Sequence, residues 1–397
     1  MRAATAKDVH FGVYVHLPFC RVQCPYCTFF TVPRPERREV FARFLAGVRR
    51  EWSLRVGPRL QSGDRLRTLY LGGGTPSDVP PDLLADFLAA LVAELPGGLG
   101  ELEETTVECN PESVTAETLA RLRAQGVDRI SLGVQALHPD DLRRLGRAAE
   151  VEQVLASIDA VAARFQRWSA DLILGIPGSS RARLRHSLTV LQQAGAPHLS
   201  FYCLELPASR AGALGTPWGE ERLARTYEFV SAWLEQRGYE HYEISSAARP
   251  GERARHNGAY WERLDYVGLG PGAHSFAASV RQANRPDLNA YLEALEQGGL
   301  PPAAREVLTP AAVRREEVLL GLRRREGVAW AVDGLEAARD FLQDLVREGL
   351  GRFEGPRFRL TTRGWMVSDS IVSQLLTYME GVAPRVDKPP PAPLHST

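Results

Sequence analysis

Three of the chain's five cysteines lie close together, in the segment Cys20-Arg-Val-Gln-Cys24-Pro-Tyr-Cys27. This C-x3-C-x2-C spacing places three thiols on one short loop, and no fourth cysteine is nearby. Thiolates are soft ligands that select iron–sulfur clusters, zinc or copper(I) over hard cations. A [4Fe–4S] cube held by three cysteines leaves one iron open to a small molecule. The triplet therefore favours a reactive cluster over an electron-storage one.

A zinc site is the main alternative that the spacing leaves open. A structural zinc ion takes four protein ligands, and the nearest further candidate is His16, which precedes Cys20. A disulfide is less favoured, because three neighbouring thiols cannot all pair with one another. Cys109 and Cys203 stand alone in apolar runs, where we expect small buried side chains.

Length and composition indicate one large α/β domain with an appendage. The 397 residues are 44% hydrophobic and 24% charged, as in ordinary globular proteins. The net charge of zero gives no electrostatic footprint for nucleic acid. The N-terminus lacks an apolar signal core, and the most apolar stretch, residues 83–95, is too short to span a bilayer. We therefore expect a reduced, cytoplasmic setting.

Short apolar runs alternate with longer amphipathic ones up to about residue 245. Because strands that alternate with helices form parallel sheets of βαβ units, the pattern predicts a partial (β/α) barrel, similar to a TIM barrel, with ligand sites at the C-terminal ends of its strands. The predicted strands are 12–17, 68–71, 105–109, 129–134, 171–174, 199–204 and 241–244. The predicted helices are 37–52, 82–94, 116–124, 151–164, 181–194 and 220–237.

The pattern changes after residue 290, so the sequence predicts a barrel domain at 1–290 and a second module at 291–381. Helices are expected at 311–323 and 335–347, followed by a hairpin at 351–360 that turns on Glu-Gly-Pro. This order is similar to a winged helix, a small α+β module. Its acidic and basic residues are interleaved, which favours a packing or lid role over DNA binding. The proline-rich tail, 382–397, is expected to be disordered.

Polar residues and glycines follow successive strands of the predicted barrel. The second strand runs into a Gly-Gly-Gly-Thr-Pro turn, where a backbone can approach a ligand closely. Alone, each residue has an ordinary alternative as a turn, a cap or a solvated side chain. Together they predict a nucleoside-like ligand site at one barrel mouth. The set comprises Gly72, Gly73, Gly74, Thr75, Glu108, Gln135, Arg147 and Asp171.

These motifs resemble those of the radical S-adenosylmethionine (SAM) superfamily, and more narrowly the oxygen-independent coproporphyrinogen III oxidase-like family with its heme-chaperone branch. The resemblance covers about residues 12–290 through the stretches 14–29, 72–76, 108–112, 133–135, 145–147, 171–178, 198–202, 242–245, 256–261 and 268–274. It implies that Cys20, Cys24 and Cys27 ligate a [4Fe–4S] cluster and that SAM chelates the fourth iron. In such proteins an electron from the cluster splits SAM to a 5′-deoxyadenosyl radical. The implied SAM pocket comprises Tyr14, Tyr26, Gly73, Gly74, Thr75, Glu108, Gln135, Arg147 and Asp171.

Two features distinguish the branches of this family. The dehydrogenases have a further cysteine two residues after the third, where this chain has Phe29. The first predicted strand also leaves little room for the N-terminal extension that dehydrogenases carry. Both departures favour a heme chaperone, whose SAM cleavage would be secondary, over a coproporphyrinogen III dehydrogenase.

A chaperone would bind heme, pass it to recipient proteins and need an electron donor, and it would meet a membrane only through a recipient. The segment from His256 to Trp261 resembles the heme-binding segment proposed for that branch. His256 is the implied axial ligand, with Tyr260 and Trp261 beside the macrocycle. The alternative is a packed histidine, and His274 is a second candidate ligand.

Overall fold

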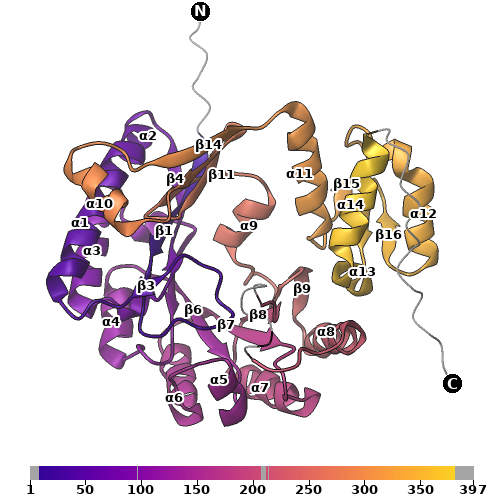
Figure 1. Ribbon diagram of the computed structural model, residues 1–397, viewed down its shortest axis with the longest axis horizontal. Coiled ribbons are helices and arrows are strands. Elements are labelled where there is room, and N and C mark those ends of the chain that lie inside the picture. The colour runs from indigo at the N-terminus through magenta and orange to yellow at the C-terminus, as the bar shows by residue number, and fades with distance from the viewer. Residues whose placement is uncertain (1–8, 96, 207–211, 213, 381–397) are drawn as a thin grey trace, which may run out of the picture. The chain divides into compact units, whose positions relative to one another are not determined.

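A computed structural model describes residues 9–95, 97–206, 212 and 214–380 of the chain (Figure 1). Two compact units divide the chain, residues 1–309 and residues 310–397, and each is described by itself. The predicted disordered tail, 382–397, lies outside the described residues. Within the described part of the chain, no helix combines the length and the apolar character needed to cross a membrane.

Parallel strands form the centre of the first unit and confirm the predicted barrel-like fold. Strands β1, β4, β5, β6, β7 and β8 pair in that order, and β11 pairs in parallel with the other side of β1. Their bounds are β1 (His10–Leu17), β4 (Arg65–Gly73), β5 (Glu104–Cys109), β6 (Arg129–Gln135), β7 (Arg167–Leu174), β8 (His198–Cys203) and β11 (Asp265–Leu269). All their C-terminal ends therefore meet at one mouth.

Helices cover the outer face of this curved sheet, whereas the short helix α9 (Arg255–Trp261) lies on its inner side (Figure 1). The outer helices are α1 (Arg38–Arg55), α3 (Pro81–Val92), α4 (Ala116–Ala124), α6 (Val151–Ala162), α7 (Arg181–Gln193) and α8 (Glu220–Glu235). Local signals set several helix ends: the Thr115 hydroxyl accepts a hydrogen bond from the Thr118 amide and caps α4.

Antiparallel strands extend both edges of the sheet. At one edge β10 (Ser246–Ala248) pairs with β8, and β9 (Glu240–Glu243) pairs with β10. The sequence placed residues 241–244 in the parallel sheet; this was wrong, because only two residues separate β9 from β10, and such a link makes a hairpin. At the other edge β12 (His274–Ala277), β13 (Val280–Asn284) and β14 (Ala303–Val307) follow β11. The sheet ends at β14 and β9, so the barrel is open.

Residues alternate along the strands between an apolar outer face and a polar inner face. Val13, Val15 and Leu69 are fully buried on the helix side. Tyr14 and Tyr70, which pair across β1 and β4, belong to the other face. Parallel strands buried on both faces are usually apolar throughout. The polar inner face therefore makes the barrel interior a candidate ligand site.

The second unit contains the predicted helices and hairpin. It comprises α11 (Pro310–Leu322), β15 (Val328–Ala329), η4 (Leu335–Ala338), α12 (Arg339–Arg347), β16 (Gly351–Glu354), β17 (Arg357–Leu360), α13 (Thr362–Met366) and α14 (Ser368–Met379). Leu322, Leu342, Phe358 and Leu375 form its core. The first unit continues past residue 290, because β14 pairs with β13 and α10 (Leu288–Glu296) contacts α1.

Candidate cluster and cofactor site

The cysteine loop is attached to the ends of β1 and β4. Cys20 ends the short strand β2 (Phe19–Cys20), which pairs with β3 (Val32–Pro33) and so closes the loop at its base. The amides of Gly74 and Thr75 donate to the carbonyls of Leu17 and Phe19, each over 2.8 Å. The end of β4 thus lies directly against the segment that precedes the first cysteine.

The donor set of this loop fits a [4Fe–4S] cube. Cys20, Cys24 and Cys27 all carry thiol side chains, and all three are partly buried. Burial raises the pKa of Cys20 to about 11, so the loop would release a proton there on binding a metal. No three metal-ligating side chains converge on one point among the described residues. A cube offers a separate iron to each thiolate and needs no such convergence.

His16 is not placed to complete a zinc site. Its Nε2 donates to the Phe30 carbonyl over 2.8 Å, and its Nδ1 lies 3.0 Å from the Tyr14 hydroxyl. Nδ1 therefore accepts the proton of Tyr14, and both ring nitrogens are engaged. The other two cysteines lie outside the loop: Cys109 is buried, as expected, and Cys203 is half-buried at the end of β8.

Close packing of β4 on β1 requires the glycine run. Gly73 has a φ of 106°, and a Cβ there would lie 2.3 Å from Nδ1 of His16. A Cβ on Gly72 would lie 2.7 Å from the Tyr70 ring, and one on Gly74 would lie 2.6 Å from the backbone of Pro18. Side chains and backbone of the protein itself, rather than open space, therefore explain why these positions are glycine.

Glu108 ends β5 and accepts hydrogen bonds at both of its carboxylate oxygens. The Tyr70 hydroxyl donates to Oε1 over 2.7 Å, and the Gly73 amide donates to Oε2 over 2.9 Å. Burial raises the pKa of Glu108 to about 7, although these two hydrogen bonds oppose the rise. Glu108 is thus fixed in orientation beside the glycine run.

Asp171 on β7 brings a second acid to the same mouth. Ser131 donates to its Oδ2 over 3.4 Å, whereas its buried Oδ1 has no hydrogen-bond partner among the described residues. Burial raises the pKa of Asp171 to about 6, although the Ser200 and Ser131 side chains, which hydrogen-bond to the carboxylate, oppose the rise. A buried carboxylate oxygen without a partner is costly, and it suits a hydroxyl or amine of a bound ligand.

Arg147 lies between the cysteine loop and the strand ends. Its Nη2 donates to Oε2 of Glu112 over 2.8 Å and to the Gly133 carbonyl over 3.3 Å. It also interacts with Cys24 and with Tyr26, whose hydroxyl pKa is raised by burial. In this structure Arg147 neutralises the carboxylate of Glu112, which is part of the protein rather than of a ligand.

Gln135, at the end of β6, has a φ of 65°. Non-glycine residues rarely adopt this left-handed conformation, and strained residues of this kind are enriched at functional sites. The structure therefore brings together at one barrel mouth the cysteine loop, the glycine run, Glu108, Gln135, Arg147 and Asp171, as the sequence predicted.

His256 and Tyr260 lie apart from the cysteine loop, on α9 inside the barrel. The His256 side chain is only 1% exposed. Its Nδ1 lies 2.8 Å from the Thr68 hydroxyl and its Nε2 lies 2.8 Å from the Tyr260 hydroxyl. Burial lowers the pKa of His256 to about 4, so the ring is neutral. This is the setting of a packed histidine, the alternative that the sequence left open, whereas His274 is exposed at the start of β12.

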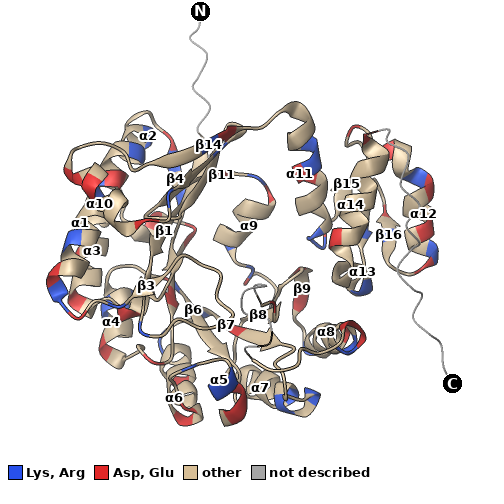
Figure 2. Ribbon diagram, in the orientation of Figure 1, with Lys and Arg blue, Asp and Glu red and all other residues tan. Residues whose placement is uncertain are grey.

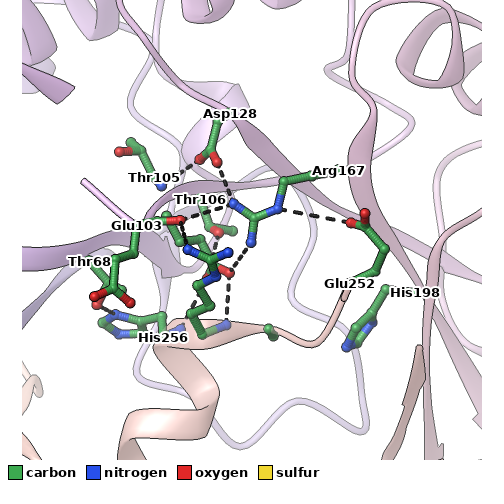
Figure 3. Close-up of polar contacts among 12 residues, drawn as sticks. Thr68, Glu103, Thr105, Thr106, Asp128, Arg167, His198, Glu252 and His256 are labelled. Atoms are coloured by element: carbon green, nitrogen blue, oxygen red, sulfur yellow. Dashed lines mark hydrogen bonds and ion pairs between the residues drawn. The ribbon is translucent and has the colours of Figure 1, made fainter. Parts of the chain in front are cut away.

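Sequence reasoning missed a charged cluster at the opposite end of the barrel (Figure 3). Glu104 is fully buried, pairs with Arg167 over 3.1 Å, and accepts the amides of Arg255 and His256 over 2.8 and 3.2 Å. Arg167 also pairs with Asp128 over 2.5 Å. A signal was present, because Glu104, Arg129 and Arg167 each begin a strand. This cluster closes the barrel floor and caps α9.

Comparisons with known proteins agree with this fold. A family model of the radical SAM superfamily matches residues 14–191. The structure of coproporphyrinogen III oxidase (HemN) from Escherichia coli, a radical SAM enzyme, has a TM-score of 0.78 to this chain at 21% identity. The alignment covers 94% of this chain and 92% of that one. The fold and the matched domain are thus those of a radical SAM protein.

Relatives of similar length define a narrower family. The heme chaperone HemW of Mycobacterium tuberculosis is 36% identical over 375 residues, which are 92% of this chain and 95% of the relative. HemW of Bacillus subtilis is 30% identical over 385 residues, 92% of this chain and 99% of the relative. The chain therefore belongs to the HemW family of the radical SAM superfamily. Membership of that superfamily implies a [4Fe–4S] cluster and SAM.

Proposed function

We propose that this chain is a radical SAM heme chaperone, which binds heme and passes it to recipient proteins. The observation that carries the proposal is the identity of 36%, over nearly the full length of both chains, to a protein named heme chaperone HemW. Phe29, at the position of the additional dehydrogenase cysteine, supports the same reading. Coproporphyrinogen III dehydrogenation is the second candidate, because an enzyme that acts on that compound shares the fold.

In this proposal Cys20, Cys24 and Cys27 hold the cluster, which supplies one-electron chemistry when it is bound. The strand-end residues bind and orient SAM beside it. The unpartnered Oδ1 of Asp171 supports a hydrogen bond to a ligand hydroxyl or amine. The proposed SAM contacts are Tyr14, Tyr26, Gly73, Gly74, Thr75, Glu108, Gln135, Arg147 and Asp171.

The heme contacts that the sequence assigns to His256 and Tyr260 stay a prediction. Iron could reach Nε2 of His256 only after that nitrogen released the Tyr260 hydroxyl, which lies 2.8 Å away. The exposed His274 needs no such rearrangement. Heme titration of His256→Ala and His274→Ala separates the two, because loss of the Soret shift in one variant alone identifies the ligand.

Recipient proteins and an electron donor complete the proposal, in a cytoplasmic location. Nucleic acid is not among the proposed partners. Acidic and basic residues alternate along the ribbon (Figure 2), and Arg339 and Arg347 on α12 pair with Glu336 on η4 and Asp344 on α12. The described residues of the second unit therefore offer mixed charges rather than the basic stripe that nucleic acids require.

An anaerobic assay tests the function as a whole. Protein reconstituted with iron and sulfide is given coproporphyrinogen III, SAM and a reductant, and is titrated with heme in parallel. We expect stoichiometric heme binding, transfer to an apo-hemoprotein and no protoporphyrinogen. Formation of protoporphyrinogen would overturn the chaperone proposal.

A cysteine pair tests the cluster. Cys24→Ser should lose the visible absorption and the iron of the reconstituted protein, because the cube loses one of its three protein ligands. Cys203→Ser, a half-buried cysteine outside the loop, is the matched control and should keep both. Full iron content in Cys24→Ser would remove the triplet from the proposal.

A further inference from the structure

An unbroken set of contacts connects helix α9 to the glycine run. The imidazole of His256 stacks on the Tyr70 ring, with the ring centroids 5.0 Å apart. The Tyr70 hydroxyl donates to Oε1 of Glu108, whose Oε2 accepts the amide of Gly73. Three elements, α9, β4 and β5, are therefore joined through side chains that end at the proposed SAM site.

Hydrogen bonds and packing contacts hold the imidazole of His256 in place. The Thr68 hydroxyl engages one ring nitrogen (Figure 3). The Tyr260 hydroxyl engages the other nitrogen, and the Glu104 carboxylate accepts the backbone amide of His256. Gly12 leaves the space for it: a Cβ there would lie 2.8 Å from the Thr68 hydroxyl and 3.4 Å from the imidazole. A ring fixed in this way is a rigid support for the aromatic side chain stacked on it.

We infer that His256 is a positioning residue of the SAM site, which acts through Tyr70 on Glu108 and on the glycine run. The inference deepens the proposed function and rests on SAM binding at these strand ends. Tyr70 donates to one carboxylate oxygen of Glu108 only when its ring keeps its tilt, and the stacked imidazole sets that tilt. Without that donor, a buried carboxylate oxygen is left unsatisfied, and the acid can turn away from its ligand.

The link between Glu108 and Gly73 extends this effect to the cysteine loop. Residues 73–75 also hold the first cysteine: Gly74 and Thr75 donate to the backbone of residues 17 and 19, and the Thr75 hydroxyl lies 3.6 Å from the Cys20 sulfur. A change at His256 should therefore reach the SAM site by way of Glu108 without removing a cluster ligand. This separates a positioning role from an iron-binding role for the same histidine.

The pH at which SAM binding is half-maximal reports the state of Glu108. An ionised carboxylate accepts hydrogen bonds from SAM more strongly than the neutral acid. Loss of the Tyr70 donor should raise the pKa of Glu108 further, and the midpoint should move to higher pH. The titratable and charged groups that face Glu108 are Tyr70 on β4, Arg129 on β6, Asp171 on β7, Tyr14 on β1, Tyr202 on β8 and Tyr260 on α9.

The experiment measures SAM affinity by anaerobic equilibrium dialysis, over a range of pH, for the cluster-loaded full chain without heme. Tyr70→Phe keeps the stacked ring and removes only the hydroxyl; it should weaken SAM binding about tenfold and shift the midpoint upward. His256→Ala should do the same, and His256→Gln, which can still reach Tyr260, should recover part of the affinity. Tyr239→Phe is the matched control, because this buried tyrosine donates to the Ala196 carbonyl, remote from the site.

Unchanged SAM affinity and pH midpoint in both Tyr70→Phe and His256→Ala would overturn the inference. Loss of heme binding in His256→Ala with unchanged SAM affinity would also overturn it and would assign the imidazole to heme iron. Should His256→Ala fail to fold, His256→Gln takes its place, and unchanged SAM affinity in Tyr70→Phe would still overturn the inference. Wild-type protein that binds no SAM would instead contradict the proposed function itself.

Discussion

Buried acids are the residues that distinguish this barrel interior from a packed core. Burial raises the pKa of Glu108 and Glu243 to about 7 and that of Asp171 to about 6. Each acid ionises less readily in the folded chain than in the unfolded one, so its charged form reduces stability. Such a cost is typical of residues that are retained for binding rather than for folding.

The contribution of Glu108 to the free energy of unfolding of the ligand-free protein should therefore fall as the pH rises, whereas buried neutral histidines such as His256 contribute with the opposite sign. Between a usual pKa of 4.5 and a folded pKa of about 7, the folded state binds the proton of Glu108 and the unfolded state does not. The contribution of this proton to the free energy of unfolding is fully present below the usual pKa and is lost as the pH rises through the folded-state pKa. The difference between the two pKa values corresponds to about 3 kcal/mol. Urea unfolding of cluster-free wild type and Glu108→Gln at about pH 5 and about pH 8 measures this contribution, because the histidines contribute equally in both proteins.

Glu108→Gln should remove about 3 kcal/mol of that pH dependence, because the amide does not titrate. Glu117→Gln on α4 changes an acid whose side chain is 65% exposed and should leave the dependence as it is in the wild type. An identical pH dependence in Glu108→Gln and the wild type would show that Glu108 does not carry a raised pKa.

Sequence reasoning identified the residues at the barrel mouth but not the surroundings of His256. Cys20, Glu108 and Asp171 were found because each lies in or after an apolar run whose strand character is evident from nearby residues. Two partners of His256, Thr68 and Tyr70, are far away in the sequence. The six-residue motif contains its third partner, Tyr260, but carries no information about these two. Only the packing of the folded chain shows that the imidazole lies in the barrel interior.

Helix α9 depends on a charge supplied by another element. Its first two amides are held by Glu104, which no solvent reaches and which also faces the buried Arg129. Replacing Glu104 would leave the Arg129 charge without this buried partner, a larger loss than at the surface.

Glu104→Gln should lower the free energy of unfolding by about 3–5 kcal/mol. Its neighbour Glu103 supplies a matched control, since its side chain is 37% exposed and pairs with a half-exposed Arg67. Glu103→Gln should cost less than about 1 kcal/mol. Equal losses in the two variants, measured by urea unfolding, would contradict the role of Glu104 as the buried anchor of α9.

The sequence predicted the strands of the βαβ units but not strands β11 to β14 at one edge of the sheet. The predicted helix 116–124 and α4 coincide, and the six sequential parallel strands lie where apolar runs indicated them. Strands β11 to β14 were missed, because they are short and because β14 is exposed along its whole length. An edge strand without a buried face has no hydrophobic alternation by which to recognise it.

At the scale of the whole molecule, the boundary between the two units is open to a direct test. A chain that ends after Thr309 keeps β14 paired with β13, whereas a chain that ends after Ala290 leaves β13 as an unprotected edge and interrupts α10. We expect the first to be monomeric with a cooperative thermal transition, and the second to aggregate. Calorimetry and size-exclusion chromatography distinguish the two, and equal behaviour would place the boundary at residue 290.

The open edge of the sheet has a consequence for the size of the molecules that the interior can admit. In a closed barrel the number of strands and their stagger fix the diameter. Here β9 and β14 are the two ends of the sheet and no ladder joins them. The interior can therefore widen at this gap without breaking a hydrogen bond between paired strands, so the sheet itself sets no fixed limit on the width of a molecule held inside it.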